Sequence, residues 1–561
     1  MNRFIFFFLL IGSGITTSAQ TYPQNYFRHP LAIRMELVSN FGELRTNHWH
    51  MGLDIRTQRR ENLSVYASAE GYVGRVVVAP GGFGQAIYIH HPNGLSTLYA
   101  HMNAFYPALA AYVKQKQYEN ESWAVDLQLP PGMFPLKKGD YIGKSGNTGG
   151  SAGPHVHFEI RDTKTEKVLN PLLFNFPIAD AVPPTINRLV MYDRNRSTFH
   201  QSPQSLSIKK TGGVYKLATP RTIKVGSDKI SFAIGATDRF SNSTNPNGIY
   251  SARISMDGNP VAEFVHDSID YNETRYMNAQ IDYPWHARAG VYVQHVNPLP
   301  GAQKVAYNIY KDEGIIYLQD EEVHAIIIDV KDAKKNNSRI QFNIQYDSKL
   351  ATSFSDENEK FAPNQVNIFE EDGFELYTEE GSLYDTAYVT YNFTNSTAAT
   401  AVSGIHSFLS HHIPVHDSIT VRIKPSRELS AEEADKVLIR NVSGKRITIQ
   451  KARLQNGWLM ARFRQFGTFQ ALIDETPPAI NTPASNLTKS SSIVFTPTDN
   501  FNVIKSFRAE LNGNWLMFTN DKGKRWIYRF DQKFPKGNHE LKVRIEDAVG
   551  NVSEKVFKVR R

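Results

Sequence analysis

The residues best suited to metal chemistry lie in three short segments of the first third of the chain. His50 and Asp54 are four positions apart, His101 ends a strand-like segment, and His155 and His157 are separated by one residue. In an extended strand, residues two or four apart point to the same face, so each pair presents its side chains to one space. Two imidazoles and one carboxylate supply three protein ligands for Zn²⁺ and leave a fourth position for water. The spacing therefore predicts a hydrolytic zinc site.

The composition restricts which side chains can hold that metal. The chain has 561 residues, 18 histidines and no cysteine. Disulfides, thiolate zinc sites, iron-sulfur clusters and cysteine nucleophiles are thereby excluded. Gly52 lies between two candidate ligands and leaves room for an ion. Glu159 continues the face of His155 and His157, and Tyr99 precedes His101 by two residues. Both are candidates for orienting a ligand ring, with ordinary strand packing as the alternative.

A glycine-rich segment, residues 143–153, precedes the His155 pair and superficially resembles a phosphate-binding loop. Such a loop needs a glycine five residues before its Gly-Lys-Ser, and that position is Lys138. The segment is better explained as a cleft wall. Its backbone amides would bind an extended peptide, and its glycines would allow a close approach.

The elements that must position these residues are short strands separated by turns. Strand patterns cover residues 71–78, 85–90, 96–101 and 155–160, which predicts an antiparallel β domain. Pro107, Leu109, Tyr112 and Val113 have helical spacing instead, so residues 103–135 are predicted to form a helical insertion. The insertion either restricts which peptides enter the cleft or covers the cleft. The alternative is an insertion on the surface with no role at the site.

The remainder of the chain is rich in strand patterns, and two parts of it repeat. The repeat pairs residues 180–186 with 474–480, 236–240 with 497–501, and 328–332 with 544–547. Two copies of one sandwich-like module are expected. The predicted division is a signal peptide at 1–20, a β domain with the candidate zinc site at 21–177, an Ig-like sandwich at 178–347, a β-rich domain at 348–473 and a second Ig-like sandwich at 474–561.

The N-terminus and the charge indicate where the protein acts. Met1 to Arg3 is positive, Phe4 to Ile15 is apolar and Thr16 to Gln20 is small and polar, the pattern of a secretory signal peptide. No later window is long and apolar enough for a stable membrane span. The formal charge is +8. Without clustered basic residues, this charge indicates a solvated surface rather than a nucleic-acid partner.

Residues 41–161 resemble the lysostaphin-type, or LytM-like, zinc metallopeptidases that cut peptide bridges in bacterial cell walls. The resemblance is carried by His50-Met-Gly-Leu-Asp54, Tyr99-Ala-His101-Met, Gly139-Asp-Tyr-Ile-Gly143 and the segment Ser145 to Arg161. It implies that His50, Asp54 and His157 bind one Zn²⁺ per chain. It also implies that His101 and His155 flank the water and the scissile carbonyl. Noncatalytic relatives typically lack one or more of these five residues, and this chain has all five.

The strand patterns and the resemblance together predict a mainly β protein, with an antiparallel β-sheet peptidase domain followed by three β-sandwich-like domains. The helical insertion in the first domain departs from the family pattern. The implied function is a secreted, periplasmic endopeptidase that hydrolyses peptidoglycan stem-peptide cross-links, with the C-terminal domains contacting a cell-envelope partner. A noncatalytic or gated scaffold that regulates other wall enzymes is the first rival. A metal cupin is the second, but it would need a glutamate at position 161 or 162, where Arg and Asp stand.

Overall fold

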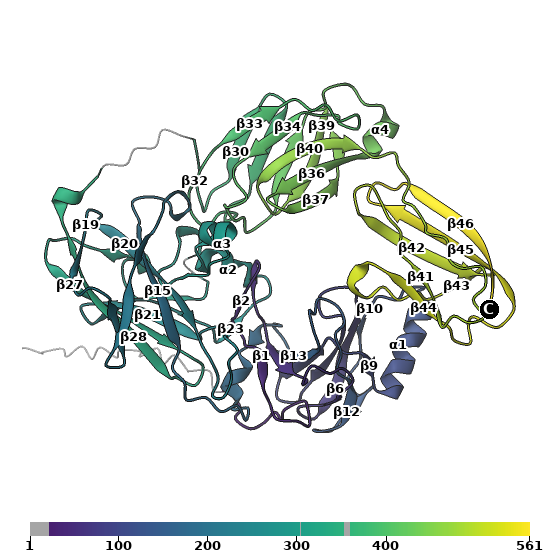
Figure 1. Ribbon diagram of the computed structural model, residues 1–561, viewed down its shortest axis with the longest axis horizontal. Coiled ribbons are helices and arrows are strands. Elements are labelled where there is room, and N and C mark those ends of the chain that lie inside the picture. Colours follow the sequence, from purple (N-terminus) through teal and green to yellow (C-terminus); the bar gives the residue numbers. More distant parts are fainter. Residues whose placement is uncertain (1–21, 303–304, 353–358) are drawn as a thin grey trace, which may run out of the picture.

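The computed structural model describes residues 22–302, 305–352 and 359–561 (Figure 1). The predicted signal peptide lies outside these residues. Strands dominate the described chain, and the helices are few and short, which confirms the predicted mainly β class. Four β units follow one another in a ring around a central opening. The last unit lies beside α1 (Pro107–Glu119) of the first (Figure 1). Within the described residues, no helix combines the length and the apolar character needed to cross a bilayer.

The first unit is built on one antiparallel sheet that carries the candidate site. Its strand order is β1 (Leu37–Ser39), β4 (Leu53–Arg56), β13 (His155–Asp162), β8 (Leu95–Ala100), β7 (Gln85–His90), β6 (Gly71–Val78) and β10 (Val125–Gln128). A small second sheet contains β5 (Ser64–Tyr66), β12 (Tyr141–Lys144) and β9 (Ala104–Phe105). The core joins both sheets, because Val65 and Ile142 of the small sheet cluster with Val76, Ile87 and Phe158 of the large one.

The predicted helical insertion is only partly helical. Helix α1 covers Pro107–Glu119, but β10 follows it and pairs with β6, as does β11 (Pro135–Leu136). Val125 lies opposite Val78 in that pairing. The edge of β6 would otherwise leave its backbone groups unpaired, so the chain after the helix is used to extend the sheet. The insertion therefore lies at the sheet edge remote from the strands that carry the histidines.

The second unit is a sandwich of two sheets with extra segments. One sheet has the order β16 (Gln204–Leu206), β15 (Thr185–Asp193), β20 (Lys229–Thr237) and β24 (Gln294–His295). The other contains β17 (Ile208–Thr211), β18 (Val214–Leu217), β28 (Asn337–Tyr346), β27 (Val323–Lys331), β21 (Ser251–Met256), β22 (Asn259–Val265) and β25 (Tyr307–Ile309). Helices α2 (Met277–Gln280) and α3 (Tyr283–Ala289) interrupt the pattern. Strand β23 (Ser268–Ile269) leaves the unit and pairs with β14 (Val168–Leu169) of the first.

The last two units are also paired sheets. The third contains β30 (Asn367–Glu371), β31 (Phe374–Thr378), β35 (Ile419–Ile423), β39 (Trp458–Phe463) and β38 (Arg453–Gln455), facing β33 (Tyr391–Thr394), β34 (Ile405–Phe408), β40 (Gly467–Ile473), β36 (Val437–Ser443) and β37 (Arg446–Lys451). The fourth contains β43 (Asn514–Trp515), β42 (Ile504–Leu511), β45 (Asn538–Asp547) and β46 (Val552–Arg560), with β41 (Ser492–Phe495) and β44 (Trp526–Arg529). Each has its own apolar cluster.

Candidate metal centre

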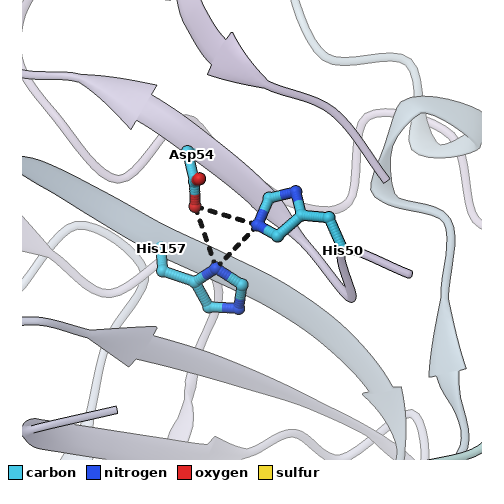
Figure 2. Close-up of side chains that lie close together, drawn as sticks. All are labelled: His50, Asp54 and His157. Carbon is cyan, nitrogen blue, oxygen red and sulfur yellow. Dashed lines mark hydrogen bonds and ion pairs between the residues drawn. The ribbon is translucent and has the colours of Figure 1, made fainter. Parts of the chain in front are cut away.

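Three neighbouring elements bring the predicted ligands together. Asp54 on β4 and His157 on β13 are direct partners across the antiparallel pair, so their side chains share one face. His50 lies in the turn after β3 (His48–Trp49) and before β4. Figure 2 shows the three side chains converging on one point. All three are at most 6% exposed.

The ligand atoms have the spacing that a tetrahedral zinc ion requires. His50 Nε2 lies 3.0 Å from Asp54 Oδ1 and 3.1 Å from His157 Nδ1, and the last two atoms are 3.0 Å apart (Figure 2). Ligand atoms about 2.0–2.1 Å from a tetrahedral zinc are about 3.3 Å from one another. The three residues form a group that could hold a metal ion. Their geometry and chemistry fit Zn²⁺.

Each ligand is oriented by a partner on its far side. His50 Nδ1 donates to the Asn40 carbonyl over 2.7 Å, and His157 Nε2 donates to Glu159 Oε1 over 2.8 Å. Asp54 Oδ2 accepts from Arg45 over 3.0 Å. These bonds direct His50 Nε2, His157 Nδ1 and Asp54 Oδ1 toward the metal position, which is the usual arrangement around protein-bound metals. Glu159 therefore has the orienting role predicted for it.

Gly52 is required by the closeness of the two strands. A Cβ at this position would lie 2.6 Å from the Phe158 carbonyl oxygen and 2.9 Å from the His157 ring. Any larger residue would displace a ligand. The glycine between two ligands thus gives room for the imidazole of His157, next to the position of the ion.

His101 and His155 lie beside the ligand group, and His155 presents Nε2 to it. His101 Nδ1 is 2.8 Å from the Thr148 carbonyl, and His155 Nδ1 is 2.8 Å from the Gly153 carbonyl. A carbonyl only accepts hydrogen bonds, so Nδ1 of each neutral ring carries the proton and Nε2 keeps its lone pair. The ring centroids of His101 and His155 are 4.7 Å apart. His155 Nε2 is 3.3 Å from Asp54 Oδ1.

The electrostatics of the site favour anionic carboxylates and a neutral His101. Burial, reinforced by His157 and His155, lowers the pKa of His101 to about 3. Burial alone would raise the pKa of Asp54, but the neighbouring imidazoles of His50, His155 and His157 hold it well below its usual range. Burial likewise opposes ionisation of Glu159, yet Arg161 and His157 lower its pKa to about 2.

The orienting role considered for Tyr99 is not seen in the structure. Its hydroxyl accepts from the Ser68 amide over 2.7 Å and from the Thr97 hydroxyl over 3.0 Å, on the face of the sheet away from the ligands. Tyr99 lies opposite Phe158, whereas Ala100 lies opposite His157. His101 has φ +60°, so the chain leaves the strand there, and strand alternation does not extend from Tyr99 to His101.

Sequence reasoning missed two partners of the ligands. Arg45 holds Asp54, as described above. Tyr271 comes from the second unit, two residues beyond β23, and its hydroxyl donates to Glu159 Oε1 over 2.5 Å. Arg161 donates to Glu159 Oε2 over 2.7 Å and lies over the Tyr271 ring. No local pattern in the sequence signals a contact between residues that are 112 positions apart.

The ligands open into a cleft of about 700 Å³. Gly82 and Phe83 line one part of it, and residues 150–154 of the glycine-rich segment line another, in keeping with the predicted cleft wall. Tyr271 also lines it, together with Arg56 and Arg59. None of its lining residues belongs to the insertion at 103–135. The insertion therefore does not form a wall of the cleft.

The fourth unit also reaches this cleft wall. The Gly149 amide donates to Asp521 Oδ1 over 2.8 Å, and the Lys522 ammonium donates to the Ser151 carbonyl over 2.7 Å. The Lys522 amide donates to the Pro80 carbonyl over 2.8 Å. Two backbone groups of the glycine-rich segment are thus bonded to a loop from the far end of the chain.

Comparisons with known proteins agree with this geometry. Residues 48–118 match the model of peptidase family M23, and residues 358–474 match the model of a Zu5-like domain. A DD-carboxypeptidase/endopeptidase, Mpg, of Neisseria meningitidis is 33% identical over 135 residues, which are 24% of this chain and 23% of the relative. An uncharacterized metalloprotease of Haemophilus influenzae is 27% identical over 172 residues, 30% of each chain.

Among solved structures, the catalytic domain of the M23 protein EnpA from Enterococcus faecalis is 21% identical, with a TM-score of 0.20. The match covers 26% of this chain and 95% of that domain. This chain spans less than a third of the length of the curated relatives it matches, as the 23% and 30% covered above indicate. The similarity is thus one of the first unit, not of whole proteins.

Proposed function

We propose that this chain, whose first unit contains a peptidase family M23 domain, is a zinc-dependent endopeptidase that hydrolyses peptide cross-links of bacterial peptidoglycan. The observation that carries the proposal is the joint placement of His50, Asp54 and His157 with ligand atoms 3.0–3.1 Å apart, beside two further histidines. The Neisseria relative supports the choice of bond, since it is a DD-carboxypeptidase/endopeptidase.

In this proposal His50 Nε2, Asp54 Oδ1 and His157 Nδ1 hold one Zn²⁺. When bound, zinc polarises the scissile carbonyl and lowers the pKa of its water toward about 7. His101 and His155 share the proton transfers: one Nε2 accepts the proton of the attacking water, and the other stabilises the developing oxyanion or protonates the leaving amine. Their Nδ1 bonds to carbonyls fix the tautomer that leaves Nε2 basic.

The cleft supports a peptide substrate that carries free carboxylates. Backbone groups of residues 150–153 border it, and an extended peptide forms strand-like hydrogen bonds with such groups. Arg56 and Arg59 also line the cleft, and Arg59 makes no ion pair among the described residues. Peptidoglycan stem peptides combine an extended backbone with exposed carboxylates, so they match this lining.

We propose that the other three units position the peptidase. The proposal keeps the division 21–177, 178–347, 348–473 and 474–561, with an envelope protein or the wall itself as the partner of the C-terminal units. It also keeps an extracytoplasmic site of action, with residues 1–20 as the signal peptide. The match of residues 358–474 to a Zu5-like domain supports treating the third unit as a separate module.

The test is digestion of purified cross-linked peptidoglycan by the zinc-loaded full chain, with products identified by mass spectrometry. We expect cross-linked dimers to disappear with the wild type and with His412→Ala, a variant of a loop histidine in the third unit. They should persist with His157→Ala and after chelation. Intact dimers despite one bound zinc per chain would reject the endopeptidase and favour the noncatalytic scaffold, whose test is binding to wall enzymes.

A further inference from the structure

A second group of acidic residues lies at the junction between the first and second units. Asp180 follows the first unit, Asp238 follows β20 and Asp332 follows β27, and each offers an oxygen within 4.8 Å of the others. Asp238 is 2% exposed and Asp332 is 1% exposed. Three carboxylates that come from distant parts of the chain are thus gathered in a largely buried space.

The same group occurs again in the fourth unit. Asp474, Asp499 and Asp547 also lie with their oxygens within 4.8 Å of one another. Asp474 follows β40, the last strand of the third unit, and Asp547 ends β45. These residues occupy the positions of Asp180, Asp238 and Asp332 in the internal repeat. Two copies of the module have therefore kept all three carboxylates together.

The hydrogen bonds around the two groups also correspond. Asn336, four residues after Asp332, donates its amide N–H to Asp332 Oδ1 and its side-chain amide to Asp332 Oδ2. Asn551, four residues after Asp547, makes the same two bonds to Asp547. Each asparagine side chain also donates to the backbone carbonyl of the first aspartate, Asp180 or Asp474. The asparagine thus fixes one carboxylate and ties it to the linker.

Buried oxygens in both groups lack hydrogen-bond donors. Asp238 Oδ1 and Asp474 Oδ2 have no partner, although these residues are 2% and 1% exposed. Asp180 Oδ2 and Asp499 Oδ1 are also without partners. Unpaired buried carboxylate oxygens are costly, and native proteins normally satisfy them with a donor or a metal.

The two groups of carboxylates have no ion-pair partner among the described residues. In the part of the chain that the structure describes, none of the six carboxylates forms an ion pair with Lys, Arg or His. Burial, with Asp180 and Asp332 nearby, raises the pKa of Asp238 to about 8. Burial similarly raises the pKa of Asp474. Each group therefore presents clustered oxygen ligands whose negative charge needs an external positive partner.

We propose that each group binds one Ca²⁺ and that the two ions stiffen the junctions before the second and the fourth units. Carboxylate and carbonyl oxygens are the ligands of hard cations, and Ca²⁺ tolerates the irregular geometry of ligands from three loops better than Mg²⁺ does. Both groups adjoin a neighbouring unit. Asn245 donates to the Val38 carbonyl of the first unit, and Val549 packs with Leu438 and Leu472 of the third.

The test is calorimetric titration of the zinc-loaded full chain with Ca²⁺, in buffer cleared of divalent cations. We expect two Ca²⁺ per chain and a rise in the unfolding temperature. Asp238→Asn and Asp499→Asn should each remove one binding event. Asp257→Asn is the matched control, because Asp257 lies in the turn at the opposite end of the second sandwich and should leave both events intact.

The variants also separate loss of the ion from loss of the fold. Without Ca²⁺, Asp238→Asn and Asp499→Asn should unfold at or above the wild-type temperature, because each removes one of three carboxyl groups crowded together without a cation. Only the Ca²⁺-dependent rise should shrink. No heat of binding at millimolar Ca²⁺, two binding events retained in both variants, or binding of Mg²⁺ in preference to Ca²⁺ would overturn the proposal.

Discussion

His101 and His155 are prepared for proton transfer by the same device, a backbone carbonyl that holds Nδ1–H and leaves Nε2 basic. We predict that His101→Asn and His155→Asn, made separately, each lower kcat by about 10²–10⁴-fold, the usual contribution of a general acid or base. Bound zinc should stay at one per chain, because neither residue belongs to the ligand group. Turnover of a purified cross-linked peptide and metal analysis would measure the two effects.

The control for this prediction is His90→Asn, since His90 lies on β7 with its ring against Tyr72. That variant should keep both zinc and turnover. If zinc were lost together with activity in the His155 variant, His155 would be a ligand rather than a proton carrier.

Glu159 is a positioning residue, because it touches His157 and not the reacting atoms. We predict that Glu159→Gln weakens zinc binding by about 10–100-fold, the usual cost of removing a partner of a ligating histidine. Tyr271→Phe removes only the hydroxyl that donates to Glu159 and should have a smaller effect in the same direction. Competition with a chelating dye would give both affinities. If wild type and Glu159→Gln bound zinc with equal affinity at saturating dye, Glu159 would not be a positioning residue for His157.

The five candidate site residues stand out in the sequence because their types suit zinc and they lie in or next to strand patterns. Their division into ligands and flanking histidines came from the family resemblance. The partners could be predicted only where the same strand supplies them. Glu159 is two residues from His157, whereas Tyr271 reaches the site through β23 and has no local signal. For Tyr99 the structure favours the packing alternative, because strand alternation ends at His101, whose φ of +60° a sequence pattern does not reveal.

At the scale of elements, the sequence predicted several strands but not which strands pair with one another. Strand patterns at 71–78, 85–90 and 155–160 correspond to β6, β7 and β13. The segment after α1 has no clear strand pattern. It forms β10 because the edge of β6 is available for pairing. The internal repeat was visible in sequence, but only the fold shows that its three aspartates meet.

Strand β34 carries a buried histidine that should make the third unit sensitive to acid. His406 is 2% exposed, accepts or donates a bond to the Tyr391 hydroxyl and stacks on Phe374. Burial lowers the pKa of His406 to about 4. The unfolded value is about 6.5, so between these pH values the unfolded chain binds more protons than the folded one. Above pH 6.5 the titration of His406 does not change the free energy of unfolding. As the pH falls from 6.5 toward 4, it lowers that free energy progressively.

Between pH 6.5 and 4, the free energy of unfolding of the wild type should fall by up to about 1.4 kcal/mol per pH unit because of His406. We predict that His406→Gln removes this dependence on pH. The variant should therefore lose less free energy of unfolding than the wild type between pH 6.5 and 4.5. Denaturant unfolding at the two pH values would show this, since other buried histidines such as His295 are common to both proteins. Identical losses would mean that His406 titrates normally in the folded state.

At the scale of the whole molecule, the ring closes through contacts between the first and fourth units (Figure 1). Lys114 of α1 lies 3.1 Å from Asp531, Glu121 lies 2.7 Å from Arg508, and the Tyr118 ring is 5.4 Å from Trp515. The insertion thus serves as the docking site of the last unit. This role depends on the contact of the fourth unit with the first, which no local sequence pattern could predict.

Ring closure brings the loop with Asp521 and Lys522 against the glycine-rich segment, whose residues 150–154 line the candidate cleft. These residues occupy the Gly149 amide and the Ser151 carbonyl, the kind of backbone groups that an extended peptide would use. A substrate must therefore compete with the loop for hydrogen bonds. The fourth unit is expected to restrain the peptidase rather than to assist it.

We predict that Asp521→Ala combined with Lys522→Ala raises kcat/KM on a soluble cross-linked peptide several-fold, mainly through a lower KM. The matched control is Asp531→Ala, which breaks the Lys114 pair in the same interface but away from the cleft. Exposed ion pairs contribute about 0–1 kcal/mol, so this control should leave the ring closed and kcat/KM unchanged. Steady-state kinetics would measure both variants. A fall in kcat/KM for the double variant would instead show that the loop supports the cleft wall in its active position.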